Sequence, residues 1–435
     1  MSGPSTLPTS QAPSALEYGG DEISALVLDP GQCWTRAGFA GEDTPKTVIP
    51  SHYGYVNGGD EGKKYYFGDN DVHALRPGME IANPMADGIV ADWDVAPQLW
   101  KYALTSRLTT ELSEHPLLIT EPVWNTPKNR EKTAEIAFED FDVPAFYLAK
   151  SAVCAGFASG KPTALVIDIG ASNISVTPIH DGIVLKKGSV RTPLGGDFIS
   201  NQIRSHFAAN GIPLSAHYQV QSKMPVEVGK PAEATLRQFK SGEEPTESWK
   251  AFQEERVLTE FKECTAQVWA GPGPVPAQGT EGIGGRTFEF PDGYNLVFGA
   301  ERFRITEGIF APRQMLIHGE IPHPDPETTQ GFGGMVFSAV RDVDIEIKPH
   351  ILNNTVVTGS GSLLYGLNDR INNEMANVFP GPRVRLTASG NSTERSYASW
   401  LGGSILASLG SFHQLWVSKK EYEEHGPGIV EKRCK

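Results

Sequence analysis

The feature that most constrains the fold is a unit that the chain contains twice, an apolar strand that runs into an aspartate and then a glycine. The first copy, ALVLDPG, ends with Asp29 and Gly31, and the second, ALVIDIG, ends with Asp168 and Gly170. A carboxylate at the end of a buried strand is costly unless a cation stays nearby, and Mg²⁺ takes oxygen ligands. Glycines beside the acid let backbone N–H groups approach phosphate oxygens. One copy alone would be an ordinary turn, but two copies predict related half-molecules that hold a phosphate group between them.

A third segment, NNTVVTGSGSLLYGLNDRINNEM, is predicted to form a strand, a glycine loop and a helix. The loop contains Gly359, Ser360 and Gly361. A loop of this kind before a helix is a site for anions and nucleotides, because free N–H groups and the helix dipole meet there. It matches neither the Walker A nor the Rossmann pattern, and alone a tight structural turn would explain it. Beside the two Asp–Gly units it favours a nucleotide site.

Length and charge limit the number of domains and the kinds of partner that we expect. At 435 residues the chain exceeds what one compact core holds, which predicts two domains. The formal net charge of −14 opposes a polyphosphate backbone, so we expect no direct sequence-specific contact with nucleic acid. Basic partners such as histone tails suit this charge better, although acidity for solubility is the simpler explanation.

The remaining composition points to an ordinary globular protein. The four cysteines are scattered, which argues against a disulfide framework or a zinc site and is typical of a reducing compartment. No apolar run is long enough to span a membrane, so no membrane partner is expected. Residues 1–20 lack the pattern of a signal peptide and are expected to form a disordered tail.

Local patterns predict several further elements. Thr126 before Pro127 has the pattern of a helix cap, and the segment FYLAKSAVCAGFASG, residues 146–160, is predicted to be one helix. The glycine-rich and charged residues 51–72 are expected to form a mobile surface loop. Segments within 213–256 and 317–334 have the composition of insertions, and the C-terminal region is expected to form helices broken by glycine.

Taken together, these segments resemble actin and the actin-related proteins from about Ile23 to the C-terminus. The most specific stretches are RAGFAGEDTPKTVIP, DGIVADWD, PKNREK, LGGSILASLGSF and WVSKKEYEEHGP. The resemblance implies an α/β, actin-like fold in which two ribonuclease-H-like domains surround a nucleotide cleft, each with a smaller inserted subdomain. The implied limits are 21–50, 84–158 and 398–435 for subdomain 1, 51–83 for subdomain 2, 159–194 and 318–397 for subdomain 3, and 195–317 for an enlarged subdomain 4.

The same resemblance implies that the cleft holds ATP and Mg²⁺. Asp29 and Asp168 would lie around the magnesium waters. The implied nucleotide residues are Gly31, Gln32, Trp34 and Arg36 in the first phosphate loop, Gly170, Ala171 and Ser172 in the second, and Gly195, Lys262, Glu263, Gly359, Ser360 and Leu364 around the adenosine.

Departures from the actin pattern indicate binding without appreciable hydrolysis. Actins have serine and lysine where this chain has Gln32 and Arg36, and Asp-Gly where it has Ala171 and Ser172. The glutamine and histidine that orient the attacking water in actins align with Ser151 and Ser175. A serine hydroxyl is too short to reach the same water and is not a base near neutral pH. We therefore expect a nucleotide-binding protein that is not an enzyme.

One further departure affects the base, because a lysine that actins place over the adenine aligns with Ser396. Two surface segments also differ from those that actin uses to polymerise. Residues 51–67 lack the side-chain pattern of the actin loop that inserts into a neighbouring subunit. Residues 317–334 are enlarged by prolines and acids where actin has its inter-strand plug. These differences predict a protein that does not form filaments.

The resemblance also implies that this chain keeps the groove that actins have between their two lower subdomains. Ordinary helix packing would explain apolar residues at these spacings, but in this family some of them line a cleft that receives amphipathic helices. The predicted groove residues are Phe157, Leu401, Ile405, Leu406, Leu409 and Leu415.

The stretches YLAKSAVCAGFASGKPTALVIDIGAS and PLGGDF resemble the nuclear members of the family. Those members pair with monomeric actin in chromatin-remodelling and histone acetyltransferase complexes, which act in transcription regulation and DNA repair. The leading hypothesis is thus a non-polymerising nuclear scaffold that is folded around ATP and docks on a helix of a large complex subunit. The alternatives are a polymerising actin-like ATPase of the cytoskeleton, and a sugar kinase or heat-shock chaperone on the same scaffold. A kinase would need a sugar pocket with a catalytic aspartate, and a chaperone a following peptide-binding domain; neither is visible in the sequence.

Overall fold

The computed structural model describes residues 24–59, 62–271, 273–276, 284–315, 317 and 321–435. The predicted tail, residues 1–20, lies outside these ranges. The predicted subdomain limits are kept below only as names for the parts of the molecule.

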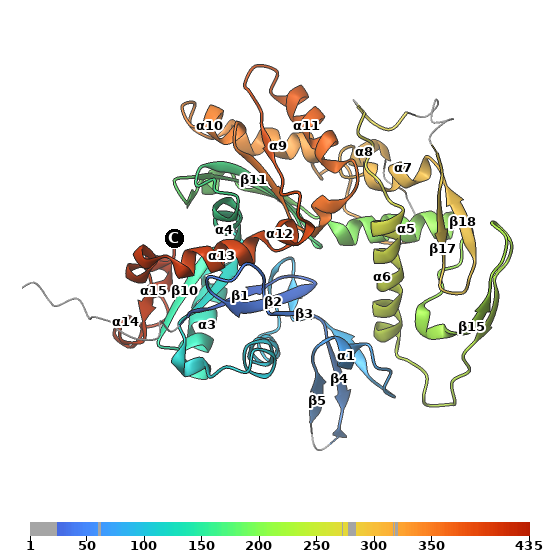
Figure 1. Cartoon of the computed structure of the whole chain (residues 1–435), viewed down its shortest axis with the longest axis horizontal. Coiled ribbons are helices and arrows are strands. Elements are labelled where there is room, and N and C mark those ends of the chain that lie inside the picture. The colour runs from blue at the N-terminus through green and yellow to red at the C-terminus, as the bar shows by residue number, and fades with distance from the viewer. Residues whose placement is uncertain (1–23, 60–61, 272, 277–283, 316, 318–320) are drawn as a thin grey trace, which may run out of the picture.

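Two mixed β-sheets form the centres of the two halves (Figure 1). The first sheet has the order β21-β10-β9-β1-β2-β3, from Val417–Ser418, Ala145–Lys150, Leu117–Glu121, Leu26–Pro30, Trp34–Phe39 and Thr47–Pro50. The second has the order β13-β12-β11-β19-β20, with β14 also paired to β12, from Ile183–Val184, Ile174–His180, Ala164–Ile169, Thr355–Thr358, Leu386–Thr387 and Val190–Thr192.

The two sheets follow the same plan, which confirms the two related half-molecules. In each, the strand of the repeated unit, β1 or β11, pairs with the next strand antiparallel and with a later strand parallel. Asp29 and Asp168 therefore occupy matching places at the ends of these two strands. The mixed α/β architecture is the predicted fold class.

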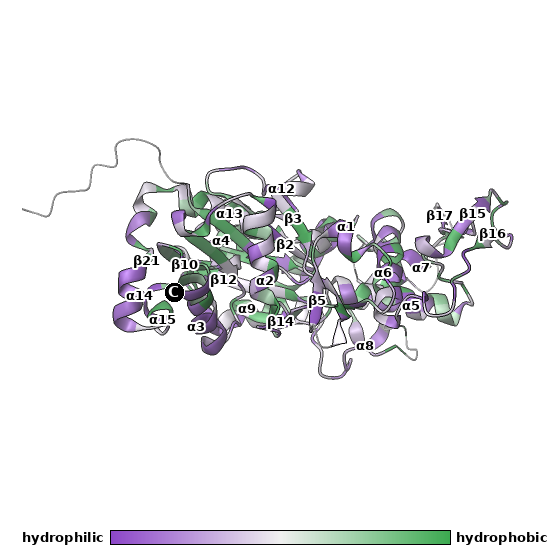
Figure 2. Cartoon of the chain, turned by 90° about the horizontal axis from the view of Figure 1, so that it is seen from below, coloured by the Kyte–Doolittle hydropathy of each residue, from purple (hydrophilic) through white to green (hydrophobic). Residues whose placement is uncertain are grey.

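Both faces of the first sheet are buried, so its strands carry apolar residues on either side. Along β1, Leu26 and Leu28 face one core cluster, while Val27 faces another that contains Trp400. The indole N–H of Trp400 donates to the Val27 carbonyl at 3.1 Å. In Figure 2 the hydrophobic colour gathers on the strands and on α4, whereas α3 and α14 at the periphery are mostly hydrophilic.

Helices cover the two sheets and join the halves. Around the first sheet they are α2 (Ala96–Lys101), α3 (Pro127–Glu135), α4 (Ser151–Ala158), α13 (Ala398–Ser408), α14 (Lys419–His425) and α15 (Ile429–Arg433). Around the second they are α9 (Phe332–Arg341), α10 (Lys348–Leu352), α11 (Leu367–Val378) and α12 (Ser392–Ser396). The cap at α3 is confirmed, because the Asn129 N–H donates to the Thr126 hydroxyl. Among the described helices, none has the length and apolar character needed to cross a bilayer.

One prediction of a helix was wrong. The segment 146–160 is not one helix, because its first part is the buried strand β10, which pairs in parallel with β9, and only then does α4 begin. Phe146 and Leu148 both belong to the core and are two positions apart, which is the spacing of a strand. The helix prediction did not take this spacing into account. The C-terminal region forms the predicted helices broken by glycine, since Gly426 ends α14 and Gly428 precedes α15, although Gly402 lies inside α13. An added Cβ at Gly402 would lie 1.8 Å from the Cys154 carbonyl oxygen, so this glycine allows α13 and α4 to pack closely.

The predicted mobile loop at 51–72 is instead a small folded subdomain. It contains β4 (Tyr53–Asn57), β5 (Lys63–Tyr66) and α1 (Asp69–Val72), and the sheet is completed by β6 (Glu80–Ala82). Ring contacts among Tyr53, Tyr65 and Phe67 give it an aromatic core. Of the glycines that indicated a loop, Gly58, Gly59 and Gly62 lie between β4 and β5, whereas Gly54 lies within β4.

Subdomain 4 lies at the far end of the second half (Figure 1). Its elements are α5 (Gly196–Ala209), β15 (Val220–Met224), β16 (Glu233–Leu236), α6 (Glu247–Cys264), β17 (Arg286–Glu289), β18 (Asn295–Phe298), α7 (Glu301–Glu307) and α8 (Pro312–Met315). Phe207 and Phe261 form its centre together with rings from β17 and β18.

Candidate functional site

A cavity of about 1900 Å³ is lined by both halves of the molecule. It brings together the two Asp–Gly units and the glycine loop after β19, which are far apart in the sequence. Its walls include the following predicted nucleotide residues: Asp29, Gly31, Gln32, Trp34, Arg36, Asp168, Gly170, Ala171, Ser172, Lys262, Glu263, Gly359, Ser360 and Leu364. Gly195 is not in the wall but lies behind it, since an added Cβ would be 2.4 Å from the Ala171 carbonyl oxygen.

Asp29 is held by two buried partners. Its carboxylate accepts a hydrogen bond from the Thr120 hydroxyl and lies 3.0 Å from an Nη atom of Arg36. The Arg36 guanidinium also stacks over Tyr397, at 5.0 Å from the ring centroid. The predicted phosphate residue Arg36 therefore neutralises Asp29 in this structure.

Asp168 differs from Asp29 because its charge has no direct partner. Among the described residues, no hydrogen bond or ion pair reaches its carboxylate. Burial raises the pKa of Asp168 to about 6, the negative charge of Asp29 adds to this effect, and Arg36 opposes it. A half-buried carboxylate without a partner, in the wall of the cavity, is suited to a cation such as Mg²⁺.

Glycine is required beside Asp168. Gly359 has a φ of +87°, and an added Cβ would lie 2.4 Å from a carboxylate oxygen of Asp168. A side chain here would both strain the backbone and occupy the space beside the acid. The glycine loop after β19 thus keeps open the place where a cation and phosphates would lie.

The second Asp–Gly turn is braced by the start of α5. The Gly170 N–H donates to the Asn173 carbonyl at 3.0 Å, which closes the turn. From α5, the Gly196 N–H donates to the Gly170 carbonyl at 3.0 Å and the Asp197 N–H to the Ala171 carbonyl at 2.8 Å. The loop is therefore fixed in shape before any ligand arrives, which lowers the cost of binding.

The side chain of Gln32 binds a neighbouring hairpin and is not free for a phosphate contact. Its amide NH₂ donates to the Met85 carbonyl at 3.1 Å, and its amide oxygen accepts from the Gly88 N–H at 3.1 Å. These contacts tie the first loop to the hairpin of β7 (Met85–Ala86) and β8 (Ile89–Val90). Both ends of the amide are thus occupied, so a phosphate contact by Gln32 would have to come from its backbone N–H.

The turn of this hairpin connects the two halves, a role that sequence reasoning missed. Asp87, with a φ of +53°, forms an ion pair with Arg191 and lies 3.4 Å from the Asn173 side-chain nitrogen. On the other side the Trp124 indole N–H donates to the Asp87 carbonyl at 3.0 Å. The dipeptide Asp87–Gly88 indicated a turn in the sequence, but nothing in it indicated contacts with both halves.

The residues aligned with actin's water-positioning pair both lie in the cavity wall. Ser151 begins α4, and Ser175 pairs with Asp168 across β11 and β12. Glu121 lines the same part of the wall, but its carboxylate is already bound by Arg130 and Lys150. Neither serine is a base near neutral pH, and the carboxylate of Glu121 is engaged by two cations.

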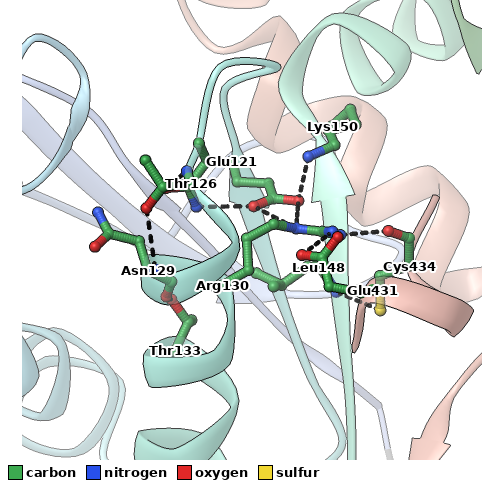
Figure 3. Close-up of polar contacts among 10 residues, drawn as sticks. Glu121, Thr126, Asn129, Arg130, Thr133, Leu148, Lys150, Glu431 and Cys434 are labelled. Atoms are coloured by element: carbon green, nitrogen blue, oxygen red, sulfur yellow. Dashed lines mark hydrogen bonds and ion pairs between the residues drawn. The ribbon is translucent and has the colours of Figure 1, made fainter. Parts of the chain in front are cut away.

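Glu121 lies at the centre of a buried polar network at the base of the first half (Figure 3). Its carboxylate is 2.9 Å from Nε of Arg130 and 2.6 Å from Nζ of Lys150. Arg130 continues the network to Glu431, at 2.5 Å, and to the carbonyl oxygen of Cys434. Burial lowers the pKa of Lys150, and the charge of Glu121 opposes that change. The network joins the edge of the cavity to the C-terminal helix α15.

The predicted groove residues divide into three groups by their exposure. Leu406 is only 8% exposed and belongs to the core cluster with Trp400, so for this residue the structure supports the alternative of core packing. Leu409 and Leu415 are 42% and 45% exposed, and so they present apolar surface to solvent. The remaining three, Phe157, Leu401 and Ile405, are half-buried.

Comparisons with known proteins agree with this geometry. The family model described as Actin matches residues 20–435. The protein named Actin-related protein 4 from Emericella nidulans is 50% identical, over 97% of this chain and 99% of its own length. The protein of the same name from Neurospora crassa is 44% identical over the whole of both chains. A Schizosaccharomyces pombe protein named SWI/SNF and RSC complexes subunit arp42 is 39% identical, over 95% of this chain and all of its own length.

Proposed function

The chain belongs to the actin family, and from this premise we propose that it is a non-polymerising nuclear member that binds ATP as a structural nucleotide. It acts, paired with monomeric actin, as a scaffold subunit of chromatin-remodelling and histone acetyltransferase complexes, and docks on an amphipathic helix of a large subunit. Because the chain belongs to the actin family, we set aside the alternatives of a sugar kinase and a heat-shock chaperone.

The observation that carries the nucleotide proposal is the unpartnered Asp168 in a cavity that two glycine-bearing turns and a glycine loop surround. The cavity is large enough for a nucleotide, and the turns are fixed in shape. The carboxylate of Asp168 has no partner among the described residues, which favours binding of a cation. Asp168 and Asp29 would hold Mg²⁺ through its waters, and the bound ion would neutralise phosphate charge. Arg36, which already faces Asp29 at 3.0 Å, would hold that acid in place.

Slow or absent hydrolysis follows from the side chains around the same acid. An attacking water needs a group that orients it and accepts its proton. Ser151 and Ser175 offer only short hydroxyls, and the nearby Glu121 is bound by two cations. The two histidines in the cavity wall, His52 and His73, both pack on Phe252 beside subdomain 2. The nucleotide is therefore expected to persist as ATP.

The variant Asp168→Asn separates ligand binding from folding. Without nucleotide it is expected to melt at the same temperature as the wild type or higher, because it removes an unpaired, half-buried charge near Asp29. With ATP and Mg²⁺ it is expected to lose most of the stabilisation that the wild type gains, with binding weakened about tenfold or more. Thermal shift with and without ligand measures both effects, since binding to the folded state raises stability by mass action. The exposed Asp342→Asn is the control and should behave as the wild type.

Chromatography of the heat-extracted protein identifies the nucleotide. Recovery of ATP supports the proposal, whereas mostly ADP or steady phosphate release at an actin-like rate would contradict the absence of hydrolysis. A wild-type protein that contains no nucleotide and shows no thermal shift with ATP and Mg²⁺ would contradict binding.

The scaffold role draws on the relatives and on the surface. One relative's name places that protein in SWI/SNF and RSC complexes, and this chain presents exposed leucines where the family groove is expected. The net charge of −14 also suits basic partners such as histone tails. Affinity purification from cells, with identification of the co-purifying chains, tests the assignment. Sedimentation with ATP, Mg²⁺ and salt tests the alternative of a polymerising ATPase, for which a pellet would be the sign.

A further inference from the structure

Glu255 is the centre of a charged cluster between α5 and α6, two helices of subdomain 4 that contact each other (Figure 1). Its carboxylate accepts a hydrogen bond from the Ser200 hydroxyl. An Nη atom of Arg204 lies 3.3 Å from one carboxylate oxygen, and Nζ of Lys262 lies 3.2 Å from the other. The three charged residues of the cluster line the cavity. Two cations and a hydroxyl group around one carboxylate are a set of donors that would also suit a phosphate.

The ammonium group of Lys262 is fully engaged within the protein. It has three N–H donors, of which one is used by Glu255. It also donates to the Ser200 hydroxyl at 2.7 Å and to the Gly196 carbonyl at 3.3 Å. Lys262 was predicted to lie around the adenosine, but a ligand would have to compete with Glu255 for this cation.

The cluster adjoins the second Asp–Gly turn. While the Gly196 carbonyl accepts from Lys262, the Gly196 N–H donates to the Gly170 carbonyl at 3.0 Å. The charges of the cluster also reach the first loop. Burial raises the pKa of Cys33 to about 12, the charge of Glu255 adds to this rise, and the charge of Lys262 opposes it. A phosphate chain held between the two turns would therefore lie within range of both charges.

We propose that Glu255 is a specificity-determining residue of the nucleotide site, because its carboxylate fills an anion site and so withholds Arg204 and Lys262 from the phosphates of a ligand. The inference rests on the proposed binding of ATP. A fixed negative charge in the cavity wall also repels a polyanion that arrives without its metal ion. The site would thus take the magnesium complex of ATP and discriminate against the metal-free nucleotide.

Binding of ATP, ADP and AMP at low salt, with Mg²⁺ and with EDTA, tests this role. Glu255→Gln is expected to lower the Kd of metal-free ATP about tenfold, because it removes one negative charge and frees Lys262. The gain should be smaller for the Mg²⁺ complex. It should also decrease with the number of phosphates, to about twofold for AMP, and shrink at high salt, since charge carries it. Loss of a merely structural contact would instead weaken all three nucleotides by the same factor.

Glu260→Gln is the matched control, because it removes the same charge from the same helix. The Glu260 side chain is 39% exposed, close to the 36% of Glu255. It pairs with His217 and Arg256, and it is not among the described residues that line the cavity. The affinities of this variant for all three nucleotides should match those of the wild type.

The double variant Glu255→Gln/Lys262→Met removes the ion pair without changing the net charge. It should show the wild-type ratio of ATP to AMP affinity, because the intact pair is neutral toward the ligand. If Glu255→Gln does not fold, this variant still tests the proposal, since it leaves no lysine without its partner. A ratio that departs from the wild type would overturn the proposal, because Lys262 would then contact phosphate in the intact protein.

Unchanged or uniformly weakened affinities in Glu255→Gln would also overturn it. If the wild type binds no nucleotide, the proposed function fails, and metal-free tripolyphosphate becomes the probe of the anion site. Glu255→Gln should then bind tripolyphosphate about tenfold more tightly than the wild type does. Equal binding by the two proteins would show that Glu255 does not fill an anion site.

Discussion

Replacement of Glu121 by glutamine is expected to lower the free energy of unfolding by about 3–5 kcal/mol, the cost of breaking a buried ion pair on one side. Arg130 and Lys150 approach this carboxylate from two sides, and the side chains of all three are at most 4% exposed. Glutamine keeps the shape but leaves two buried cations near each other, and among the described residues Glu431 is the remaining acid paired with either of them. Chemical denaturation measures the change as a shift of the midpoint at constant slope.

Two further variants show whether the loss comes from uncompensated charge. Glu121→Gln combined with Lys150→Met should recover most of the lost stability, because one cation leaves with the anion and Arg130 keeps Glu431. The pair Lys132–Glu135 on α3 is a control, since its side chains are 44% and 34% exposed and its loss should cost about 0.5 kcal/mol or less. A double variant as unstable as Glu121→Gln alone would contradict the charge explanation.

The loss of stability in Glu121→Gln should also depend on pH. The buried Lys150 determines whether this loss grows or shrinks as pH rises. Burial lowers the pKa of Lys150, so the folded state releases this proton at a lower pH than the unfolded chain does. Between the two pKa values the unfolded state binds more protons, and stability therefore rises with pH. Without Glu121 to oppose the effect, the penalty should shrink as pH rises from neutrality toward about 10, near the ordinary pKa of lysine.

This network also shows where sequence reasoning reaches its limit. A charged residue at the end of FYLAK gives no sign that it is buried, and its partner lies 29 positions earlier in the chain. The pairing exists only because β9 and β10 lie in parallel register, and the second of these was predicted as part of a helix. An error in one local element thus hid a long-range ion pair.

The nucleotide site was more predictable because its parts are local. An apolar run, an acid and a glycine within a few residues determine a strand end and a turn, whichever partners lie beyond. Almost all predicted nucleotide residues therefore line one cavity. The roles of individual side chains were less predictable. Gln32 turns to the β7–β8 hairpin and Arg36 to Asp29, since each depends on a neighbour contributed by another segment.

The contact between α6 and subdomain 2 and the folded state of residues 51–72 were not predicted, for a common reason. Glycine, charge and proline indicate turns and surface exposure, but they do not show what a surface segment packs against. The aromatic residues of subdomain 2 and the tryptophan at the start of α6 were the available signals. The aromatic residues of subdomain 2 pack mainly against one another, whereas Trp249 bonds to Val72, 177 positions earlier in the chain.

The second large effect is expected at the exposed part of the groove. Leu409→Asp combined with Leu415→Asp should abolish co-purification with actin-containing complexes. A groove that receives a helix gains most of its affinity from a few buried apolar anchors, each worth about 1–3 kcal/mol. An unpaired charge at each position would add a desolvation cost. Both leucines are more than 40% exposed, so the fold should tolerate the change.

Three measurements on this variant separate docking from damage to the fold. Its melting temperature and its ATP content should match the wild type, whereas Leu406→Asp, which places a charge in the core beside Trp400, should melt far earlier. Ile345→Asp is the matched surface control, because Ile345 is 79% exposed and lies outside the groove, and it should co-purify normally. Intact co-purification of the Leu409/Leu415 variant would show that the partner helix docks elsewhere. Loss of partners together with early melting would show that these leucines serve the core, as Leu406 does.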